Sequence, residues 1–422
     1  MQRNKLDFLE LIKSDATAAL GCTEPIAVAY CAAECRRFFS EVPKKVSVIT
    51  SKNIYKNGKH VYVPGSGRKG LDVACIMGLL HGNYKEKLLV LNSLTENEIR
   101  DSLKFLDENH ICVSYEDFRP SIYVRVEVLA EKEVVAEIEN SHTGLKKITV
   151  DGKVVFENET ESCHCKLPEI SLEEVLDMVD EVDVEKLDFI DQSIVLNMKA
   201  AYEGLSGDYG LGCGKSLNKI YNIDKNNCES SVKTRVLTAA AADMRMGGGN
   251  CPIITSGGSG NQGINVLIPV VVAAEENNID DYKMKKAIFL SHAVNKYVKL
   301  FSGKLSGMCG CAIAAGVGSA AGITWMLGGS RNQILTSMKN MISDLAGMIC
   351  DGAKDSCALK LSTCASESVI HSKMALNGIK VEDGVGVLGK DIEETIKNIG
   401  LLSTKAFPKV DDVVLEILAK EN

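Results

Sequence analysis

The sequence predicts an α+β protein of two lobes, a small α+β domain with an antiparallel sheet and a larger, mainly helical domain. The pattern of apolar residues changes along the chain: short alternating strands occupy residues 44–164, and helical periodicity dominates residues 165–422. Gly and Ala are abundant after residue 200 and aromatic residues make up only 5% of the chain, which suits closely packed helices better than a β-sandwich. A chain of 422 residues is long enough for two or three domains.

Residues 1–43 precede both lobes, and we expect them to form a pair of helices. The pair reads as one long helix interrupted at the GCTEP motif, because Pro25 lacks an amide hydrogen and disfavours helical geometry at Glu24. The interruption places Cys22, Thr23 and Glu24 at a new helix N-terminus, where free amide hydrogens and the helix dipole stabilise a thiolate or bind a carboxylate. We expect the pair to pack on the helical lobe.

The α+β domain is predicted from short runs rich in Val, Ile and Tyr, and the Asp151-Gly152 pair predicts the tight turn of a hairpin. The expected strands are residues 44–50, 87–91, 121–130, 133–140 and the hairpin 146–157, with helices at 68–82 and 95–109 between them. We therefore expect a compact domain built on an antiparallel sheet.

Helices joined by glycine-rich loops are expected after an acidic boundary at residues 160–190, which contains a lead-in helix. The run 307–329 has no charged residue over 23 positions, which is long enough for a membrane span. Its content of Gly and Ala, with little Leu or Phe, predicts instead a buried helix at the centre of a bundle. Helical spacing of apolar residues is found in 284–300, 311–327, 332–349 and 391–402.

Charge and cysteine content bear on partners and compartment. The net charge is −8 and no basic run stands out, so we expect no nucleic acid and no membrane as partner. The first residues form an amphipathic helix without an apolar signal-peptide core, so a reducing, cytoplasmic setting with free or metal-bound thiols is expected for the 15 cysteines. Small core residues are predicted for Cys31, Cys35, Cys75, Cys112 and Cys228.

Five further cysteines stand out by position. Cys350 and Cys357 flank the segment DGAKDS, Cys309 and Cys311 precede them in the MCGC motif, and Cys22 lies alone far upstream. Structural zinc sites usually use tight CxxC knuckles, which these motifs lack. The spacing allows a 4Fe–4S cluster with three protein thiolates, which would leave one iron open as a Lewis acid. A tightly packed helix start at Gly-Cys-Gly-Cys is the alternative from spacing alone.

Two further motifs are typical of substrate-binding loops. In ENSHTG, His142 lies between Ser141 and Thr143, which suits it to bind a carboxylate or to transfer a proton. The glycine-rich motifs 247–250 and 255–263 can expose backbone amides as an anion-binding nest. Their polar side chains include Asn250, Asn261 and Gln262. A turn histidine and tight helix connections are the alternatives.

A rival interpretation concerns Lys233. The segment SVKTR at 231–235, followed by SGNQG, imitates motifs of pyridoxal-phosphate dehydratases, in which a Schiff-base lysine would also support β-elimination. That family needs alternating strands and helices around these motifs, whereas this region reads as helices only. The CHC motif at 163–165 could bind metal and is interpreted as incidental.

Taken together, these motifs resemble the L-cysteine desulfidase family, which is related to the iron–sulfur L-serine dehydratases. The motifs are GCTEPIAVAY, SHTG, GGGN followed by TSGGSGNQGI, SGMCGCAIAAGVGSAAGI and GMICDGAKDSCALK. The likeness spans nearly the whole chain, and the combination is specific although each motif alone is weak. The resemblance implies an oxygen-sensitive 4Fe–4S lyase that converts L-cysteine to hydrogen sulfide, ammonia and pyruvate without pyridoxal phosphate.

The resemblance also implies roles for single residues. The cluster ligands of the family fall on Cys350, Cys357 and the first cysteine of MCGC, Cys309, with Cys311 as the alternative. The lone catalytic cysteine falls on Cys22. With the substrate sulfur on the open iron, a Cys22 thiolate whose pKa is lowered by the helix N-terminus would take the α-proton.

Substrate binding is expected from the GCTEP motif, the SHTG motif and the glycine-rich motifs. For SHTG the resemblance supports this role, because the related dehydratases hold the substrate carboxylate with an S-H-T loop. The expected residues are Thr23, Glu24, Ser141, His142, Thr143, Asn250, Asn261 and Gln262. L-Serine is the alternative substrate, and an iron–sulfur sensor or sulfide carrier is the non-enzymatic alternative. A homodimer is compatible with the sequence.

Overall fold

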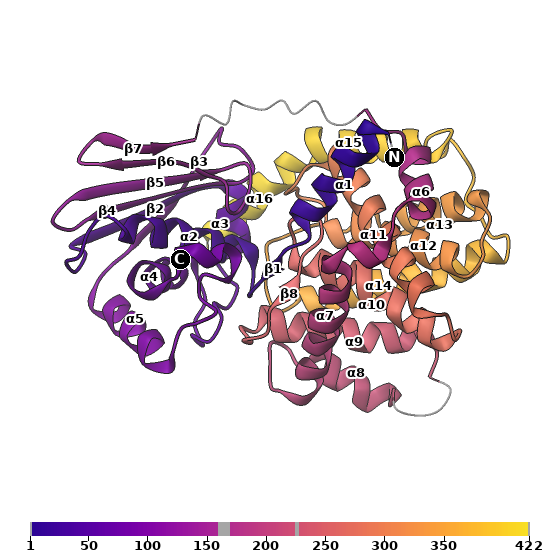
Figure 1. Ribbon diagram of the computed structural model, residues 1–422, viewed down its shortest axis with the longest axis horizontal. Helices are drawn as coiled ribbons and strands as arrows, with labels where there is room; N and C mark the ends of the chain where they lie inside the picture. Colours follow the sequence, from indigo (N-terminus) through magenta and orange to yellow (C-terminus); the bar gives the residue numbers. More distant parts are fainter. Residues whose placement is uncertain (1, 159–168, 224–227, 421–422) are drawn as a thin grey trace.

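The computed structural model describes residues 2–158, 169–223 and 228–420, so the CHC motif at 163–165 lies outside the described residues. Two lobes lie side by side in Figure 1, one built on a sheet and the other on helices. Each has its own apolar core. The predicted α+β fold class is therefore confirmed.

The small lobe is a six-stranded sheet with helices on one face (Figure 1). Its strand order is β3-β2-β4-β5-β6-β7, and only the β2–β3 pair is parallel. The sheet is therefore mixed, whereas the sequence predicted an antiparallel one. The elements are α2 (Thr23–Arg36), β2 (Lys45–Ser51), α3 (Lys52–Gly58), α4 (Leu71–His81), η1 (Tyr84–Leu89), α5 (Glu96–Glu108), β3 (Cys112–Glu116), β4 (Tyr123–Leu129), β5 (Glu133–Glu139), β6 (Leu145–Val150) and β7 (Lys153–Glu157).

The parallel pair arises because α3, α4, η1 and α5 separate β2 from β3, and a connection of that length can return the chain in the same direction. The strand β3 was not predicted from the sequence, because its residues are mostly exposed. The predicted strand at 87–91 is wrong. A short apolar run does not distinguish strand from helix, and here the run begins inside the 3-10 helix η1, capped by Asn83.

The hairpin prediction is confirmed. Asp151 and Gly152 both have positive φ, 49° and 75°, as a two-residue turn that follows the twist of the sheet requires. The expectation that both N-terminal helices pack on the helical lobe is half wrong. The first helix, α1 (Arg3–Asp15), does so, but α2 lies between α4 and the sheet. Apolar side chains surround α2, so it is buried on every face rather than on one stripe.

The large lobe consists of helices, apart from a two-stranded ladder in which β1 (Ala18–Ala19) pairs with β8 (Ile253–Ile254). In chain order the helices after α1 are α6 (Leu172–Glu181), η2 (Val184–Lys186), α7 (Asp188–Ser206), α8 (Cys213–Tyr221), α9 (Ser230–Met246), α10 (Gly260–Glu276), α11 (Asp281–Ser302), the π-helix η3 (Cys311–Ala315), α12 (Gly316–Met326), α13 (Arg331–Leu345), α14 (Cys357–Leu376), α15 (Ile392–Lys405) and α16 (Phe407–Ala419).

The uncharged run 307–329 forms η3 and α12 at the centre of this lobe, as predicted. Helix α12 is buried among α10, α11, α13 and α14. Its Gly318 and Gly322 permit close packing, since a Cβ atom there would lie 2.3 Å from Ser291 O and from Ser291 Oγ respectively. Within the described ranges, no helix is both long enough and apolar enough to cross a membrane.

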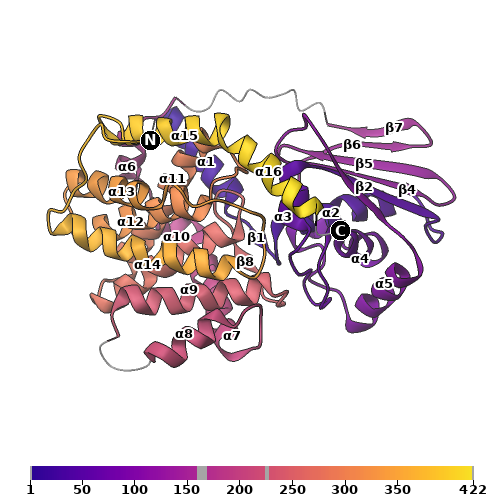
Figure 2. The same cartoon turned by 180° about the vertical axis from the view of Figure 1, so that it is seen from behind.

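Helix α16 crosses from the helical lobe to the small lobe and packs on α3 (Figure 2). The contact contains a buried ion pair between Lys56 and Asp411, 2.5 Å apart, with side chains 1% and 10% exposed. Lys56 also donates a hydrogen bond to Cys350 O at 2.9 Å. At the rim of the same contact, Lys52 pairs with Asp412 at 2.8 Å, where both side chains are about one-third exposed.

The two lysines give a matched test of this contact. Lys56→Met is expected to lower the free energy of unfolding by about 3–5 kcal/mol, because it leaves a buried carboxylate unpaired. Lys52→Met removes only exposed ion pairs and should lower it by less than about 1 kcal/mol. Urea unfolding of both variants measures the difference. Equal, small losses would mean that water reaches the Lys56–Asp411 pair.

Candidate active site

Two chain segments bring thiols of the helical lobe together. The segments around 308 and 349 run antiparallel: Cys309 N donates to Met348 O at 2.9 Å, and Cys350 N donates to Gly307 O at 2.7 Å. Cys309 and Cys350 are thereby held next to each other. Cys357 is the first residue of α14 and closes the same loop. The segment CDGAKDSC thus belongs to the loop that connects α13 to α14.

The thiol loop, residues 350–357, turns at Gly352. Its φ of +100° is a conformation that residues with a side chain rarely adopt, and a Cβ atom would lie 2.5 Å from Lys56 O. The loop also has an ionised carboxylate. Burial raises the pKa of Asp351, but the hydrogen-bonded ammonium groups of Lys354 and Lys360 outweigh burial and lower that pKa to about 2.

The remote thiol, that of Cys22, comes from the start of α2 in the small lobe. Gly21, with φ of +68°, turns the chain against Pro64 and leads into Cys22, the N-cap residue of α2. The predicted new helix N-terminus at GCTEP is confirmed, but the preceding helix ends at Asp15 and the strand β1 follows it, so the two helices are not one helix interrupted at this motif. Cys22 is 3% exposed and belongs to a small apolar cluster that includes Cys357, so the thiol from residue 22 joins the thiols of the helical lobe.

A cavity of about 100 Å³, here called the thiol cavity, lies where these segments meet. Its walls include Cys22, Cys309, Cys311, Cys350 and Cys357. Four of the residues predicted to bind substrate also line it: Thr23, Glu24, Asn261 and Gln262. Cations surround it as well, namely Arg245, Lys299, Lys304 and Lys360. The structure therefore brings together sequence motifs separated by more than three hundred residues.

The protonation of Cys22 differs from the sequence-based expectation. Burial raises the pKa of Cys22 well above its usual value, and the Glu24 carboxylate raises it further, whereas Arg245 lowers it. The Cys22 thiol donates a hydrogen bond to Glu24 Oε2 at 2.9 Å. The helix N-terminus therefore does not produce a thiolate in the free protein, because burial and a neighbouring anion outweigh it.

Glu24 is the ionised member of this pair. Burial raises its pKa, but His142 and hydrogen bonds from Cys22 and Asn57 together lower it below the ordinary value. Asn57 Nδ2 donates to Glu24 Oε1 at 2.9 Å, and Thr23 Oγ1 donates to Glu24 Oε2 at 3.1 Å. A buried carboxylate with this set of donors stays ionised and accepts the hydrogen bond of the Cys22 thiol.

The two cysteines of MCGC are not equivalent. Hydrogen bonds from the thiols of Cys311 and Cys364 lower the pKa of Cys309 well below its usual value, whereas the pKa of Cys311 is raised by the same contact. The thiols of Cys309, Cys311 and Cys364 are therefore in hydrogen-bonding contact. Sequence analysis missed Cys364, although its spacing of seven residues from Cys357, two helical turns, places both on one face of α14.

Two polar side chains opposite the thiols have free hydrogen-bonding atoms. Gln262 is 5% exposed, and its Oε1 has no partner within the described part of the chain. Its amide lies over Gly310, between the two cysteines of MCGC, where a Cβ atom would be 2.5 Å from Gln262 Nε2. Arg245 donates to Asn261 Oδ1 at 2.9 Å and keeps a buried Nε without a partner in the same described ranges.

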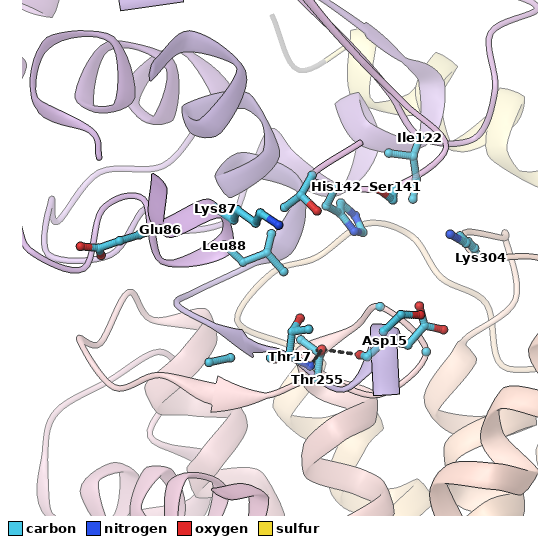
Figure 3. A pocket seen from close by; sticks show the side chains of 15 residues that line it. Asp15, Thr17, Glu86, Lys87, Leu88, Ile122, Ser141, His142, Thr255 and Lys304 are labelled. Atoms are coloured by element: carbon cyan, nitrogen blue, oxygen red, sulfur yellow. Dashed lines mark hydrogen bonds between the residues drawn. The ribbon is translucent and has the colours of Figure 1, made fainter. Parts of the chain in front are cut away.

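The predicted SHTG loop lines a second cavity of about 330 Å³, here called the outer cavity (Figure 3). The loop joins β5 to β6 and carries Ser141, His142 and Thr143. Lys304 lines both cavities, so they adjoin. Asn250 is exposed and lines neither cavity, which separates it from the other residues predicted to bind substrate.

The lysine of the rival interpretation also lies elsewhere. Lys233 is on α9 and forms an ion pair with Glu275, 2.6 Å away, at the surface. It lines neither the thiol cavity nor the outer cavity. The surroundings of Lys233 therefore give no support to a Schiff-base site.

Comparison with known proteins identifies the family. The family model described as "Serine dehydratase alpha chain" matches residues 85–416. The chain belongs to this family. The matched range contains the SHTG motif, the glycine-rich motifs and all thiols of the helical lobe, whereas the GCTEP motif precedes it.

Relatives that match nearly the whole chain extend the similarity to the N-terminal motif. A UPF0597 protein of Clostridium botulinum (strain Langeland) is 42% identical over 420 residues, which cover 98% of this chain and 97% of the relative. A UPF0597 protein of Caldanaerobacter subterraneus subsp. tengcongensis is 36% identical over 428 residues and the full length of both chains. A UPF0597 protein of Clostridium perfringens (strain ATCC 13124) is 36% identical over 418 residues, 98% of each chain.

The turn at Gly352 generates a prediction about the thiol loop. Gly352→Ala is expected to lower the free energy of unfolding by about 1–3 kcal/mol, because alanine is strained at this φ and meets the backbone of α3. It should also speed the reaction of Cys350 with a thiol reagent. Gly347→Ala is the matched control, since Gly347 lies just before the loop with open space around it. Unchanged stability and thiol reactivity in Gly352→Ala would contradict the assigned turn.

Proposed function

We propose that this protein is an iron–sulfur lyase that eliminates sulfide from L-cysteine, giving hydrogen sulfide, ammonia and pyruvate. One observation carries the proposal: thiols from the start of α2, from MCGC and from the thiol loop line one buried cavity, beside residues suited to hold an amino acid. Membership of the serine dehydratase alpha chain family supports a lyase of this type. L-Serine is the alternative substrate of the same site.

The donor set fits a 4Fe–4S cluster. Cys309, Cys350 and Cys357 supply soft thiolate ligands from two adjoining segments, and the π-helix η3 that follows Cys309 is a distortion frequently found at functional sites. When bound through three thiolates, the cluster would supply an open, Lewis-acidic iron for the leaving group of the substrate. Cys309 is preferred to Cys311 as a ligand because it is the less buried of the two and its backbone pairing with Met348 holds it next to Cys350.

Cys22 and Glu24 act as a proton pair in this proposal. The α-proton of an amino acid is too weakly acidic to be lost without a positioned base. Glu24 is placed to take the thiol proton of Cys22 along the existing 2.9 Å hydrogen bond, although the pKa values of the two groups oppose this transfer in the free protein. The resulting Cys22 thiolate takes the α-proton. Arg245, whose charge already lowers the pKa of Cys22, stabilises that thiolate.

The remaining residues orient the amino acid. His142, with Ser141 and Thr143 beside it, would bind the carboxylate at the boundary of the two cavities. The unpartnered Oε1 of Gln262 would accept a hydrogen bond from the α-ammonium group. Thr23 and Asn261 complete the wall by hydrogen bonds to Glu24 and Arg245 respectively. Together they would aim Cα at the Cys22 sulfur.

Iron analysis tests the ligand assignment. Anaerobically purified protein is expected to contain about four irons and four acid-labile sulfides per chain. Cys309→Ala should lose most of this iron, whereas Cys311→Ala, the matched control from the same motif, should keep it. The reverse pattern would transfer the ligand role to Cys311. Wild-type protein free of iron would refute the cluster.

Turnover tests the base. Cys22→Ser is expected to keep the iron and to lower kcat for L-cysteine at least about a hundredfold, the lower range for general-base catalysis. Sulfide and pyruvate released from L-cysteine, and pyruvate released from L-serine, are measured in parallel. Retained activity in Cys22→Ser would remove this residue from the mechanism, and faster release from L-serine would reassign the substrate.

A further inference from the structure

The outer cavity lies between the lobes and adjoins the thiol cavity (Figure 3). Its small-lobe wall comes from η1 and the SHTG loop, and its helical-lobe wall from the end of α1 and the glycine turn before α10. Gly257 of that turn lines the outer cavity and approaches Gln262 of the thiol cavity, since a Cβ atom there would lie 3.2 Å from Gln262 Oε1. The two cavities are thus separated by little more than one residue.

The charges around the outer cavity leave an excess of cations. The Asp15 carboxylate is neutralised by Lys296 at 2.5 Å. Glu86 accepts a hydrogen bond from Asn83 at 2.9 Å, and its carboxylate points away from His142 in Figure 3. Lys87 has no partner among the described residues. An anion would therefore be favoured in this cavity.

His142 is a buried polar group of the cavity wall. It is 7% exposed, and its Nε2 is buried without a hydrogen-bond partner in the described part of the chain. A buried nitrogen of this kind is unfavourable unless a ligand or water satisfies it. In Figure 3 the ammonium groups of Lys87 and Lys304 are directed toward His142 from opposite sides.

Lys87 has an unusual backbone conformation. Its φ of 52° and ψ of −112° interrupt the 3-10 helix η1, which is a strained arrangement for a residue with a side chain. The neighbouring Lys85 lies outside the strained position and is directed to the ring of Tyr84 at 6.0 Å. Strain retained at an exposed residue beside a cavity suggests that its side chain has a function there.

We propose that Lys87 is a specificity residue that captures the carboxylate of the incoming amino acid in the outer cavity and delivers it to His142 and Lys304. The proposal rests on the proposed lyase function. Lys87 is not a catalytic residue in it, because the thiol cavity lies beyond His142. The chemical class selected is a free α-carboxylate, so Lys87 does not raise the binding affinity of amines that lack this group.

Steady-state kinetics test the capture step. Lys87→Met is expected to lower kcat/KM for L-cysteine about tenfold at low ionic strength with kcat unchanged. Added salt should reduce this difference in kcat/KM, because it screens the charge of Lys87 in the wild-type protein. Lys85→Met, the matched control on the same helix, should behave as the wild type. Equal kcat/KM in Lys87→Met and wild type overturns the proposal, and so does a loss confined to kcat.

Binding measurements separate this proposal from the proposed function. Calorimetry with pyruvate, which has a carboxylate but no thiol, should give a roughly tenfold weaker Kd in Lys87→Met, whereas cysteamine, which has no carboxylate, should bind both proteins equally. This result stands even when the protein does not eliminate sulfide, so the two proposals fail separately. Equal pyruvate affinity, or no pyruvate binding by the wild type, overturns the role of Lys87.

A second variant tests the backbone strain. Lys87→Gly should lose pyruvate affinity as Lys87→Met does, and should unfold at a higher temperature than Lys87→Met because glycine tolerates positive φ. An unfolding temperature equal to or below that of Lys87→Met would mean that the turn is not strained, and the structural argument for retained function would fail.

Discussion

The candidate site depends on the buried interactions of the Lys56 ammonium group with Asp411 and with the backbone of Cys350. A buried charge is tolerated only with partners, and Lys56 takes them from Asp411 of the last helix and from the backbone oxygen of Cys350. Its own carbonyl lies where a side chain at Gly352 would be. One residue of the small lobe thus fixes both the thiol loop and α16. The thiol cavity is therefore a product of both lobes, although most of its cysteines come from the helical one.

The same interface explains how a thiol from the beginning of the chain reaches the others. Helix α2 is buried in the small lobe, so the position of Cys22 is set by the sheet and α4 rather than by the bundle. Glu24, two residues further, brings a carboxylate into the same apolar surroundings, where hydrogen bonds from Cys22 and Asn57 keep it ionised. Polar atoms without partners in the described ranges, among them Gln262 Oε1 and His142 Nε2, face the resulting cavities. An enzyme that must bind a small zwitterion needs such free groups, whereas a sensor of cluster state does not.

Much of this arrangement could be predicted from the sequence because it depends on local rules. Pro25 fits the first turn of α2, Asp151-Gly152 makes a turn, and glycine and alanine without charge make a central helix. Each result follows from residues close in sequence. Long-range packing could not be predicted in that way. Neither the parallel pairing of β3 nor the burial of α2 against the sheet has a local signal. The same distinction holds for the site. Its thiols and loops could be predicted from motifs, whereas Lys56, Arg245 and Asn57 contribute through long-range contacts that depend on the fold.

The protonation of Cys22 shows how magnitudes decide between two correct principles. A helix N-terminus stabilises a neighbouring anion by about 0.3–1 kcal/mol, and by up to about 2 kcal/mol in partly buried geometry. Full burial shifts a pKa by as much as about 3–5 units, each worth about 1.4 kcal/mol, in the opposite direction for a thiol. Burial therefore wins, and Glu24 adds a second anion on the same side. In the proposed mechanism the thiol becomes a base when its proton moves to Glu24, whose pKa is lowered by His142 and by hydrogen bonds from Cys22 and Asn57. Since His142 also lines the outer cavity, a carboxylate bound there would act on the same buried charge of Glu24 that the proposed activation of Cys22 requires.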